Sequence, residues 1–449
     1  MISAANFTAT VEQPSSPPLE LNEANWANAV VRALFAVMQK YDHVFYEGGH
    51  VIPPGDTSTL FTTAGIQHWR EWVLAASPES DPGRVGPQWC VRMNNLERVG
   101  RSNFLTSFCM LSSLTRGPLE REQALSRMFE VFVNQWHLPF EALSFVVTGA
   151  HPLATEDTPS IRALETLGVR PENYAVRPRK WACPFKPYGP TGPELFVLLD
   201  ITRVPCQLSC GPMCNCGRYF HFWNLEFLEN RRLPDGGVEK LAMPFLDSAG
   251  SIEWVVGAIT RTFDLYESLP FRGILERWRE ATAGSSPLLA REQLRILTDH
   301  SRTIALLLCA GIKPEAKRHG HVLRRLIRRS FAIQTIAQID LGLASLIIEE
   351  IQESYRHHHG FPAKTSSAGK IVAEEAARFT EQVDKSRKIY DRICRGAEEI
   401  GAEEVYRLHA ECGLPWELIE YSLKEDGVEW DLNRVIELRI EDKERSRRQ

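Results

Sequence analysis

The stretch EAKRHGHVLRRLIRRS at residues 315–330 concentrates positive charge in one short segment. It places six cations within thirteen residues of a chain whose formal net charge is −5. These cations are Lys317, Arg318, Arg324, Arg325, Arg328 and Arg329. Four of the arginines form two pairs spaced four residues apart, so they share one face of a helix. Guanidiniums held this close repel one another. The pattern therefore indicates either a nucleic-acid backbone against this face or ion pairs with glutamates of neighbouring helices.

The residues around this stretch predict a helical region. Beyond about residue 263 the sequence is rich in Leu, Ile, Ala, Glu and Arg and has few helix breakers. The loop that we expect in this region is HHHGFPAKTSSAG at 357–369. The predicted helical segments are 288–310, 317–332, 334–356, 370–398 and 400–424.

The preceding region has a different character. From about residue 41 to 262, short apolar or β-branched runs alternate with Gly and Pro turns, which is typical of a mostly antiparallel sheet with helices between the strands. An amphipathic helix is predicted at 23–40. We therefore predict an α+β domain over 23–262 and an all-helical domain over 263–449. A disordered tail over 1–22 is expected because Pro, Ser and Thr gather there.

The composition excludes a membrane protein. The chain has 449 residues, of which 43% are hydrophobic and 24% charged, as in soluble globular proteins. No apolar run approaches the ~20 residues that span a bilayer. The N-terminus has no basic segment leading an apolar one, so we predict no signal peptide. A cytoplasmic protein with reduced thiols is expected.

Four of the ten cysteines lie together in CQLSCGPMCNC at 206–216. They are Cys206, Cys210, Cys214 and Cys216. Four thiolates can fill a tetrahedral zinc site, which would then be structural because no position stays open for substrate. The spacing is not the common paired C-x2-C form, so free thiols in a loop and an iron–sulfur cluster remain as alternatives.

Two polar residues interrupt apolar runs: Asn224 in FWNLEF and Asp247 in FLDSAG. A buried polar side chain needs a hydrogen-bonding partner. A ligand ammonium group is one possible partner, and polar neighbours in the core, which the pattern alone favours, are the other.

Several segments together resemble one family. In chain order they are FTTAGIQHW, QWCVRMNNLERVG, GPTGP, CGRYFHFWNLEF, LDSAGSIEW and LTDHSRTIALLLCAGIKPEAKRHGHVLRRLIRR. This order is similar to that of alanyl-tRNA synthetases, and the resemblance runs from about residue 25 to about 440. The four-cysteine loop resembles the archaeal-type version. The resemblance implies a class II aminoacyl-tRNA synthetase-like antiparallel sheet with flanking helices, followed by an all-helical domain that binds the tRNA acceptor stem. The basic stretch would then face RNA.

The family reaction that the resemblance implies has two steps and uses ATP and magnesium. Alanine attacks the α-phosphate of ATP, and the 3′-terminal ribose of tRNA then takes the alanyl group. Arg92 matches the arginine that contacts the α-phosphate, Asp247 the carboxylate that binds the ammonium group, and Asn224 the pocket asparagine. Trp181 matches the pocket tryptophan, and Ala249 and Trp254 would line the same pocket.

The sequence also departs from the family pattern. Trp254 stands where the family has an arginine that binds the ATP triphosphate, and an indole cannot neutralise a phosphate. Cys109 and Phe196 stand where glutamates are expected, and Glu194 lies two residues before the second of these positions. The family's editing and C-terminal domains would be missing as well.

Three hypotheses follow for the function. The first is an alanyl-tRNA synthetase-like enzyme that handles alanine, or a similar small amino acid, as an adenylate or as aminoacyl-tRNA. It would pass the aminoacyl group to a non-standard acceptor, such as a small metabolite in a biosynthetic pathway. The second is a short alanine–tRNA ligase without editing. The third is a non-catalytic tRNA-binding paralogue.

Overall fold

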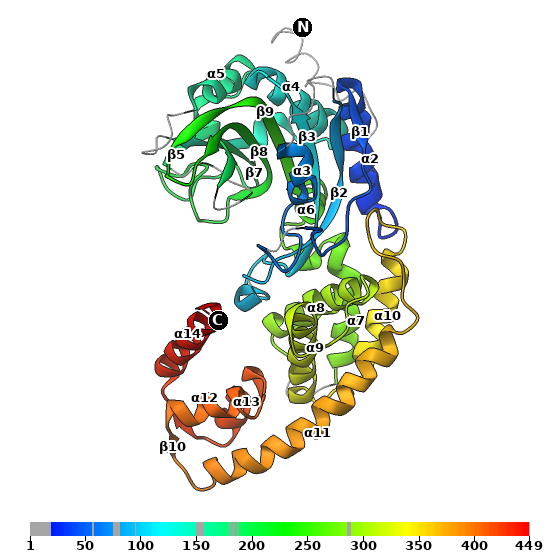
Figure 1. The fold of residues 1–449 in the computed structure, drawn as a ribbon, viewed down its shortest axis with the longest axis vertical. Coiled ribbons are helices and arrows are strands. Elements are labelled where there is room, and N and C mark those ends of the chain that lie inside the picture. The colour runs from blue at the N-terminus through cyan, green and yellow to red at the C-terminus, as the bar shows by residue number, and fades with distance from the viewer. Residues whose placement is uncertain are drawn as a thin grey trace. The chain divides into compact units, whose positions relative to one another are not determined.

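The computed structural model describes residues 19–55, 58–74, 81–94, 96–149, 157–178, 181, 185, 188–284 and 289–448. Most of the predicted tail over 1–22 lies outside the described residues. The chain forms two compact units (Figure 1). The first comprises the described residues up to Glu97, then Ser102–Gly273 and His357–Phe361. The second comprises Arg98–Arg101, Ile274–Arg356 and the residues from Pro362 onward.

A nine-stranded sheet forms the centre of the first unit. Its order is β1-β2-β3-β9-β8-β7-β4-β5, and β6 pairs with β8 beside this path. The strands are β1 (His43–Phe45), β2 (Gly83–Val91), β3 (Ser107–Arg116), β4 (Leu143–Gly149), β5 (Tyr174–Pro178), β6 (Gly189–Thr191), β7 (Glu194–Asp200), β8 (Tyr219–Arg232) and β9 (Val238–Ser251).

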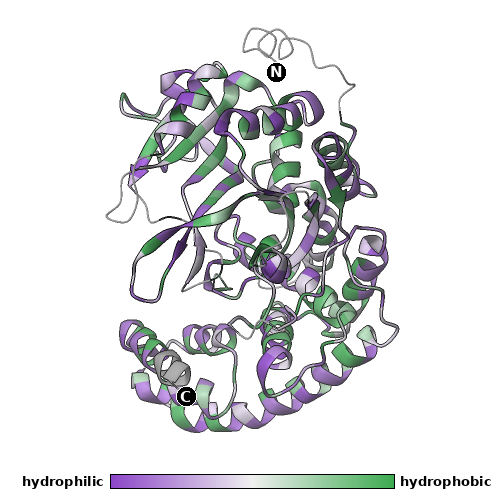
Figure 2. Cartoon of the chain, turned by 45° about the horizontal axis from the view of Figure 1, so that its top comes forward, coloured by the Kyte–Doolittle hydropathy of each residue, from purple (hydrophilic) through white to green (hydrophobic). Residues whose placement is uncertain are grey.

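The sheet is mostly antiparallel, as the alternating short runs predict. The pairs β1–β2 and β4–β5 at its two edges are parallel. The long β8–β9 hairpin lies near the centre, and hydrophilic residues interrupt the hydrophobic ones along it (Figure 2). The predicted α+β class with a class II synthetase-like antiparallel sheet is therefore confirmed.

The helices of the first unit cover the sheet. They are α2 (Trp26–Met38), α3 (Arg70–Leu74), α4 (Arg121–Phe129), α5 (Thr158–Thr166) and α6 (Ile252–Thr260). A π-helical segment, Glu130–Gln135, continues α4. Short 3-10 turns lie at Gln39–Tyr41, Gly65–Trp69, Leu96–Arg98, Phe140–Ala142, Pro171–Asn173 and Leu265–Glu267.

The hydrophobic core of this unit lies between the sheet and these helices. The ring of Trp223 in β8 lies 5.9 Å from Phe132 and 5.4 Å from Trp136, both in edge contacts. All three side chains are buried, and the indole N–H of Trp223 donates to Ser248 Oγ of β9 at 2.8 Å. This packing holds β8 and β9 rigidly from one face of the sheet.

The second unit is almost entirely helical, as predicted. Helix α7 (Leu269–Thr282) spans the boundary between the units. The following helices are α8 (Arg291–Cys309), α9 (Arg318–Ile336), α10 (Gly342–Tyr355), α11 (Ala368–Cys394), α12 (Ala402–Ala410), α13 (Trp416–Glu425) and α14 (Leu432–Arg448). Two short strands, β10 (Glu399–Ile400) and β11 (Glu429–Trp430), pair in parallel.

Two predicted helix boundaries are wrong. The segment 334–356 is not one helix: α9 ends at Ile336, Gln338 takes a left-handed conformation with φ +56°, and α10 begins at Gly342. Glutamine is not a residue that signals such a turn, and the apolar spacing continues through the break. The segment 400–424 is likewise divided between Ala410 and Trp416, where Gly413 has φ +68°.

Candidate active site

A cavity of about 310 Å³ lies at the centre of the sheet, and all of its lining residues belong to the first unit. The strands β3, β8 and β9 and the first turn of α6 contribute most of the lining. Among the lining residues are Met110, Asn224, Glu226, Asp247, Ala249 and Trp254. The two residues predicted to bind the substrate amine, Asn224 and Asp247, are therefore brought into one cavity.

The alternation of strand side chains explains this lining. Asn224 and Glu226 lie two apart in β8, and Asp247 and Ala249 lie two apart in β9. Successive side chains of a strand point to opposite faces, so each pair shares a face. In the register of the hairpin, Asn224 lies opposite Ala249 and Glu226 opposite Asp247. Directly opposed residues of antiparallel strands share a face, so all four belong to the face that lines the cavity.

Asp247 is an acid of the cavity with a strongly perturbed pKa. Its side chain is buried, and within the described part of the chain its Oδ1 has no hydrogen-bond partner. Burial raises the pKa of its carboxyl group to about 7, because an anion loses its hydration there. A buried carboxylate oxygen without a donor is rare in folded proteins. Asp247 is therefore suited to bind a cationic group of a ligand.

Arg92 supplies a positive charge in the same cavity. Its Nε donates to the carbonyl oxygen of Thr63 at 2.8 Å, and its guanidinium group lies 4.7 Å from the centre of the Phe108 ring. Burial lowers the pKa of Arg92, and the nearby Glu226 raises it. The Thr63 contact and the ring fix the orientation of the guanidinium group, whose other nitrogens can bind an anion.

A bulge in β8 adds His221 to the cavity. The pairing with β7 shifts from Val197 opposite Trp223 to Leu198 opposite His221, so Phe222 is an extra residue in β8. Such a bulge re-aims the neighbouring side chains. His221 lines the cavity, and its Nε2 lies 2.5 Å from Oδ1 of Asn224. This contact orients the Asn224 amide.

The structure places Trp254 in the cavity lining, in the first turn of α6. The adjacent Glu253 is buried and accepts from the backbone N–H of Cys109 at 3.1 Å and from Ser251 Oγ at 2.5 Å. Cys109 is itself buried. The positions that the resemblance associates with ATP therefore carry an indole and a thiol, and the Glu253 carboxylate binds the protein's own backbone.

The sequence analysis missed Glu226. The signal was present in FWNLEF, because Glu226 lies two residues after Asn224 in a predicted strand and must share its face. Phe196 lies opposite Asn224, and Glu194 lies opposite Glu226. Three carboxylates, Glu194, Glu226 and Asp247, therefore occupy one row across β7, β8 and β9. We call these three residues the carboxylate row.

The structure brings the four loop cysteines together. Their Sγ atoms all lie within 4.8 Å of one another. Cys206 lies 3.6 Å from Cys214, and Cys210 lies 3.9 Å from Cys216. Tetrahedral zinc with Zn–S bonds of about 2.3 Å separates its sulfur ligands by roughly 3.8 Å. A backbone hydrogen bond from Cys206 lowers the pKa of the Cys210 thiol to about 7. The donor set and its spacing fit zinc.

The six cations of the basic stretch divide into two groups. Arg328 Nε donates to Glu375 Oε1 at 2.7 Å, and Arg329 Nε donates to Glu417 Oε1 at 2.5 Å. These two arginines therefore form ion pairs within the second unit, as the packing alternative requires. Lys317, Arg318 and Arg325 are exposed, and Arg324 is half-buried.

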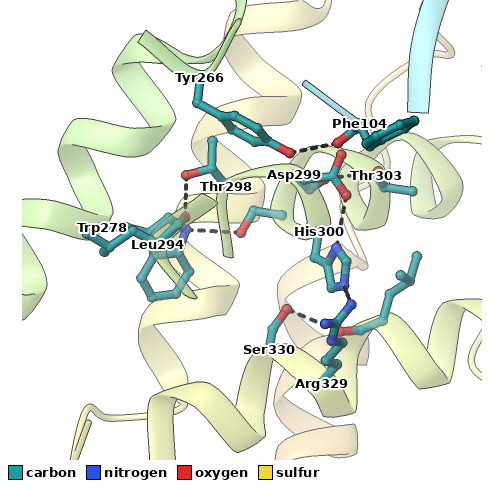
Figure 3. Close-up of polar contacts among 12 residues, drawn as sticks. Phe104, Tyr266, Trp278, Leu294, Thr298, Asp299, His300, Thr303, Arg329 and Ser330 are labelled. Carbon is teal, nitrogen blue, oxygen red and sulfur yellow. Dashed lines mark hydrogen bonds and ion pairs between the residues drawn. The ribbon is translucent and has the colours of Figure 1, made fainter. Parts of the chain in front are cut away.

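The Arg329 pair continues into the core of the second unit (Figure 3). His300 Nδ1 lies 2.9 Å from Asp299 Oδ2, and Arg329 Nη1 lies 3.5 Å from His300 Nε2. Asp299 and His300 are fully buried, and burial lowers the pKa of His300. A neutral imidazole that donates to Asp299 and accepts from Arg329 satisfies both contacts. These groups are suited to hold α8 and α9 together.

Two further predictions can be compared with the described residues. Trp181, predicted as a pocket residue, is half-buried and is not among the cavity-lining residues of the described chain. The described helices include none that is both long and apolar enough to cross a bilayer.

Comparison with known proteins gives a consistent result. The family model described as "tRNA synthetases class II (A)" matches residues 32–449. The alanine–tRNA ligase of Treponema pallidum is 27% identical over 417 residues, which cover 87% of this chain and 67% of the relative. That of Dehalococcoides mccartyi strain CBDB1 is 26% identical over 416 residues, covering 88% and 46%. The chain thus spans from about half to two thirds of the length of these relatives. By the extent of the family match, the chain belongs to the class II tRNA synthetases of the alanine type.

Proposed function

We propose that this protein binds a small amino acid in the cavity as an aminoacyl adenylate or as aminoacyl-tRNA, and transfers the aminoacyl group to an acceptor other than standard tRNA. The observation that carries this proposal is Asp247, a buried carboxylate whose Oδ1 has no partner among the described residues. An α-ammonium group would give this oxygen its missing donor. The alanine–tRNA ligases that the chain resembles supply the amino acid class.

The cavity residues divide the work of binding between the two ends of an activated amino acid. Asp247 would bind the ammonium group, with the Asn224 amide beside it. Arg92 would bind the negative charge next to the carbonyl carbon, where an adenylate carries its phosphate. Catalysis of acyl transfer from such an anhydride depends mainly on position and on neutralising the leaving phosphate. The held guanidinium of Arg92 is suited to both tasks.

The residues beside this pocket favour a specialised enzyme. The indole of Trp254 cannot neutralise the triphosphate of ATP, and a charged contact to phosphate contributes about 1.5–3 kcal/mol. The Glu253 carboxylate is bound to the backbone of Cys109 and to Ser251, so it serves the protein and not a metal-bound nucleotide. These features favour one of two arrangements. Either another enzyme makes the aminoacyl donor, or ATP binds here in a different way from the family pattern.

A second function is favoured by a specific observation. The similarity to alanine–tRNA ligases covers 87% of the chain, including the helical unit that follows the sheet. An alanine–tRNA ligase that uses ATP and magnesium to charge tRNA would retain both units. The exposed members of the basic stretch, with Arg324, would then contact the acceptor stem.

We also propose that Cys206, Cys210, Cys214 and Cys216 bind one structural zinc ion. The support is the fit of their sulfur spacing to a tetrahedral site. Such a site fixes the loop between β7 and β8, and it leaves no coordination position for substrate.

The experiment that tests the proposal compares two activities of the purified chain. The first assay measures alanine-dependent exchange between ATP and pyrophosphate. The second measures transfer from pre-charged Ala-tRNA to small amine and hydroxyl acceptors. Transfer without exchange supports a donor made elsewhere, and exchange without tRNA charging supports the adenylate route. Exchange together with tRNA charging selects the ligase. Binding of tRNA with neither activity overturns the enzymatic proposal and leaves a tRNA-binding paralogue.

A further inference from the structure

The charges that line the cavity balance one another except for one carboxylate. Among the described lining residues, the arginines, lysines and acids are Arg92, Glu226 and Asp247. Glu226 lies near enough to Arg92 for the two charges to attract each other. His221, the histidine of the lining, has its Nε2 on the amide oxygen of Asn224 at 2.5 Å. With the arginine and Glu226 in balance, the negative charge of Asp247 remains for a ligand.

The remaining carboxylate fits one ammonium group. Asp247 is 7% exposed, and its Oδ1 has no hydrogen-bond partner among the residues that the structure describes. The α-ammonium group of a single amino acid supplies the missing donor and the missing positive charge. A ligand whose net charge at this end is +1 therefore leaves the filled cavity neutral.

The positive charge of Arg92 is already engaged by the protein. Its Nε donates to the carbonyl oxygen of Thr63 at 2.8 Å, its guanidinium group lies 4.7 Å from the centre of the Phe108 ring, and Glu226 lies nearby. A phosphate next to the aminoacyl group would have to compete with Glu226 for this guanidinium. The described lining holds no second arginine or lysine to replace it. Burying an anion without a cationic partner is strongly unfavourable.

We propose that the donor bound in this cavity is an aminoacyl ester, as at the 3′ end of aminoacyl-tRNA, in which the ammonium group is the one charge beside the reacting carbon. This inference rests on the proposed function and selects one of its two donors. Asp247 binds the ammonium group, and Arg92 faces the uncharged carbonyl oxygen. The apolar surface of Trp254, which also lines the cavity, tolerates an uncharged ester better than a phosphate.

The transfer from such a donor needs no further reactant. The amine or hydroxyl group of the acceptor attacks the ester carbonyl carbon and forms the new C–N or C–O bond. The bond between that carbon and the ribose oxygen breaks, and the proton that the acceptor loses ends on the released ribose hydroxyl group. Negative charge develops on the carbonyl oxygen during the attack, and Arg92 would stabilise it there. The donor itself requires a separate ATP-dependent reaction that esterifies the amino acid to tRNA.

A matched pair of ligands tests this inference with the unmodified full chain. L-alaninamide and L-alanine have nearly the same size, and they differ in that the amide end is neutral whereas the carboxylate end is an anion. We expect calorimetry at pH 7, where α-amino groups are mostly protonated, to show about tenfold or more tighter binding of L-alaninamide. The Glu226→Gln variant should lose or reverse this preference and gain affinity for L-alanine, because Arg92 then meets the carboxylate without competition. The Glu239→Gln variant, on the exposed end of the same hairpin, should keep the preference.

The outcomes separate this inference from the proposed function. Equal or tighter binding of L-alanine by the unmodified chain overturns the ester inference and leaves the proposed function with its adenylate donor. A Glu226→Gln variant that keeps the preference shows that Glu226 does not compete for Arg92 and likewise overturns the inference. If neither ligand binds, and no transfer from Ala-tRNA to amine or hydroxyl acceptors is seen, the proposed function itself has failed. Circular dichroism checks that the sheet of each variant has formed, and the two ligands still decide on the unmodified chain if a variant does not fold.

Discussion

The cavity in the first unit and the basic stretch in the second unit differ in whether their charged side chains have partners within the protein. In the cavity, Asp247 is buried with an oxygen that accepts no hydrogen bond from any described residue. In the basic stretch, Arg328 and Arg329 end on the carboxylates of Glu375 and Glu417. Both regions were noticed in the sequence for their unusual polar residues. In the structure they differ: Asp247 Oδ1 has no hydrogen-bond partner among the described residues, whereas Arg328 and Arg329 form ion pairs.

This difference gives a criterion for interpreting an unusual charged residue that is noticed in a sequence. A charge that the protein itself neutralises has a sufficient explanation in packing. A buried charge that the protein leaves without a partner lowers stability, so it persists where a ligand needs it. By this criterion Asp247 marks a binding site, and Arg328 and Arg329 mark the contact between helices α9, α11 and α13.

The largest expected effect tests the charge in the cavity. The Asp247→Asn variant should lower kcat/KM for any amino-acid-dependent reaction by about 100-fold or more, roughly 3 kcal/mol, because the ammonium group loses its charged partner. Steady-state kinetics of exchange or transfer measure this effect. Circular dichroism and zinc content should remain unchanged. Turnover that survives the substitution would falsify the placement of the ammonium site.

The next effect tests the charge in the helices. The Arg328→Ala variant should lower the free energy of unfolding by about 2 kcal/mol, because it removes a partner from a carboxylate that is 1% exposed. The loss is moderated by Arg378, whose Nη1 lies 3.3 Å from the other oxygen of Glu375. Urea denaturation measures it.

Arg324→Ala is the matched control for Arg328→Ala. The structure gives Arg324 no ion pair with any described residue, so its replacement should change stability by less than about 0.5 kcal/mol. If Arg324→Ala weakens binding of tRNA and Arg328→Ala destabilises the fold, the two groups of cations have separate roles. Equal losses of stability in both variants would contradict the division.

A smaller effect appears in the pH dependence of stability. The pKa of Asp247 is raised from 3.8 to about 7 in the folded protein, so the folded state binds this proton more tightly than the unfolded state. Its contribution to stability is complete below pH 4 and is lost as the pH rises to about 7. Asp247→Asn should therefore be more stable than the unmodified chain at pH 8, by about 1–2 kcal/mol, and should have no such advantage at pH 4. At about 1.4 kcal/mol for each pH unit, the gain cannot exceed about 4 kcal/mol. Thermal unfolding at both pH values measures the gain, and an equal difference at pH 4 and pH 8 would contradict the assignment.

The last expected effect concerns the cysteine cluster. Here the groups are thiols, of which Cys210 receives a hydrogen bond from Arg218 Nη1 at 3.7 Å, and zinc is the proposed partner of all four. The purified chain should contain about one equivalent of zinc, and Cys210→Ser should reduce this to below half. Loss of a structural zinc ion also lowers the free energy of unfolding, because the metal binds the folded loop and not the unfolded chain. Metal analysis checks the first point, with Cys309→Ser as a control that retains zinc. Less than half an equivalent in the unmodified chain rules out the site.

Much of the site could be predicted because polar residues stand out in apolar strands. Asn224 and Asp247 were found in this way, and the register of β8 and β9 brings them into one cavity. Glu226 was overlooked although its spacing from Asn224 carried the same signal. The reason is that a glutamate near the end of an apolar run usually marks the exposed end of a strand, whereas β8 continues to Arg232 and β9 places Asp247 opposite Glu226.

In the helical unit, the local sequence predicted the helices better than it predicted where they end. It correctly indicated helices from the 3.6-residue period, yet it missed the break after Ile336 because Gln338 has no conformational preference for a positive φ. The break between α12 and α13 was predictable in principle, since Gly413 and Pro415 both end helices.

The sequence by itself determined the class of the fold, the four-cysteine loop and the family, because each depends on residue types at fixed spacings along the chain. The tertiary structure decided which charges are satisfied. Asp247, Glu226 and Arg92 come from three different strands or their ends, and Arg328 meets Glu375 across two helices. Whether a charge has a partner depends on distances between segments that are remote in the chain, and periodicity along one segment does not contain that information.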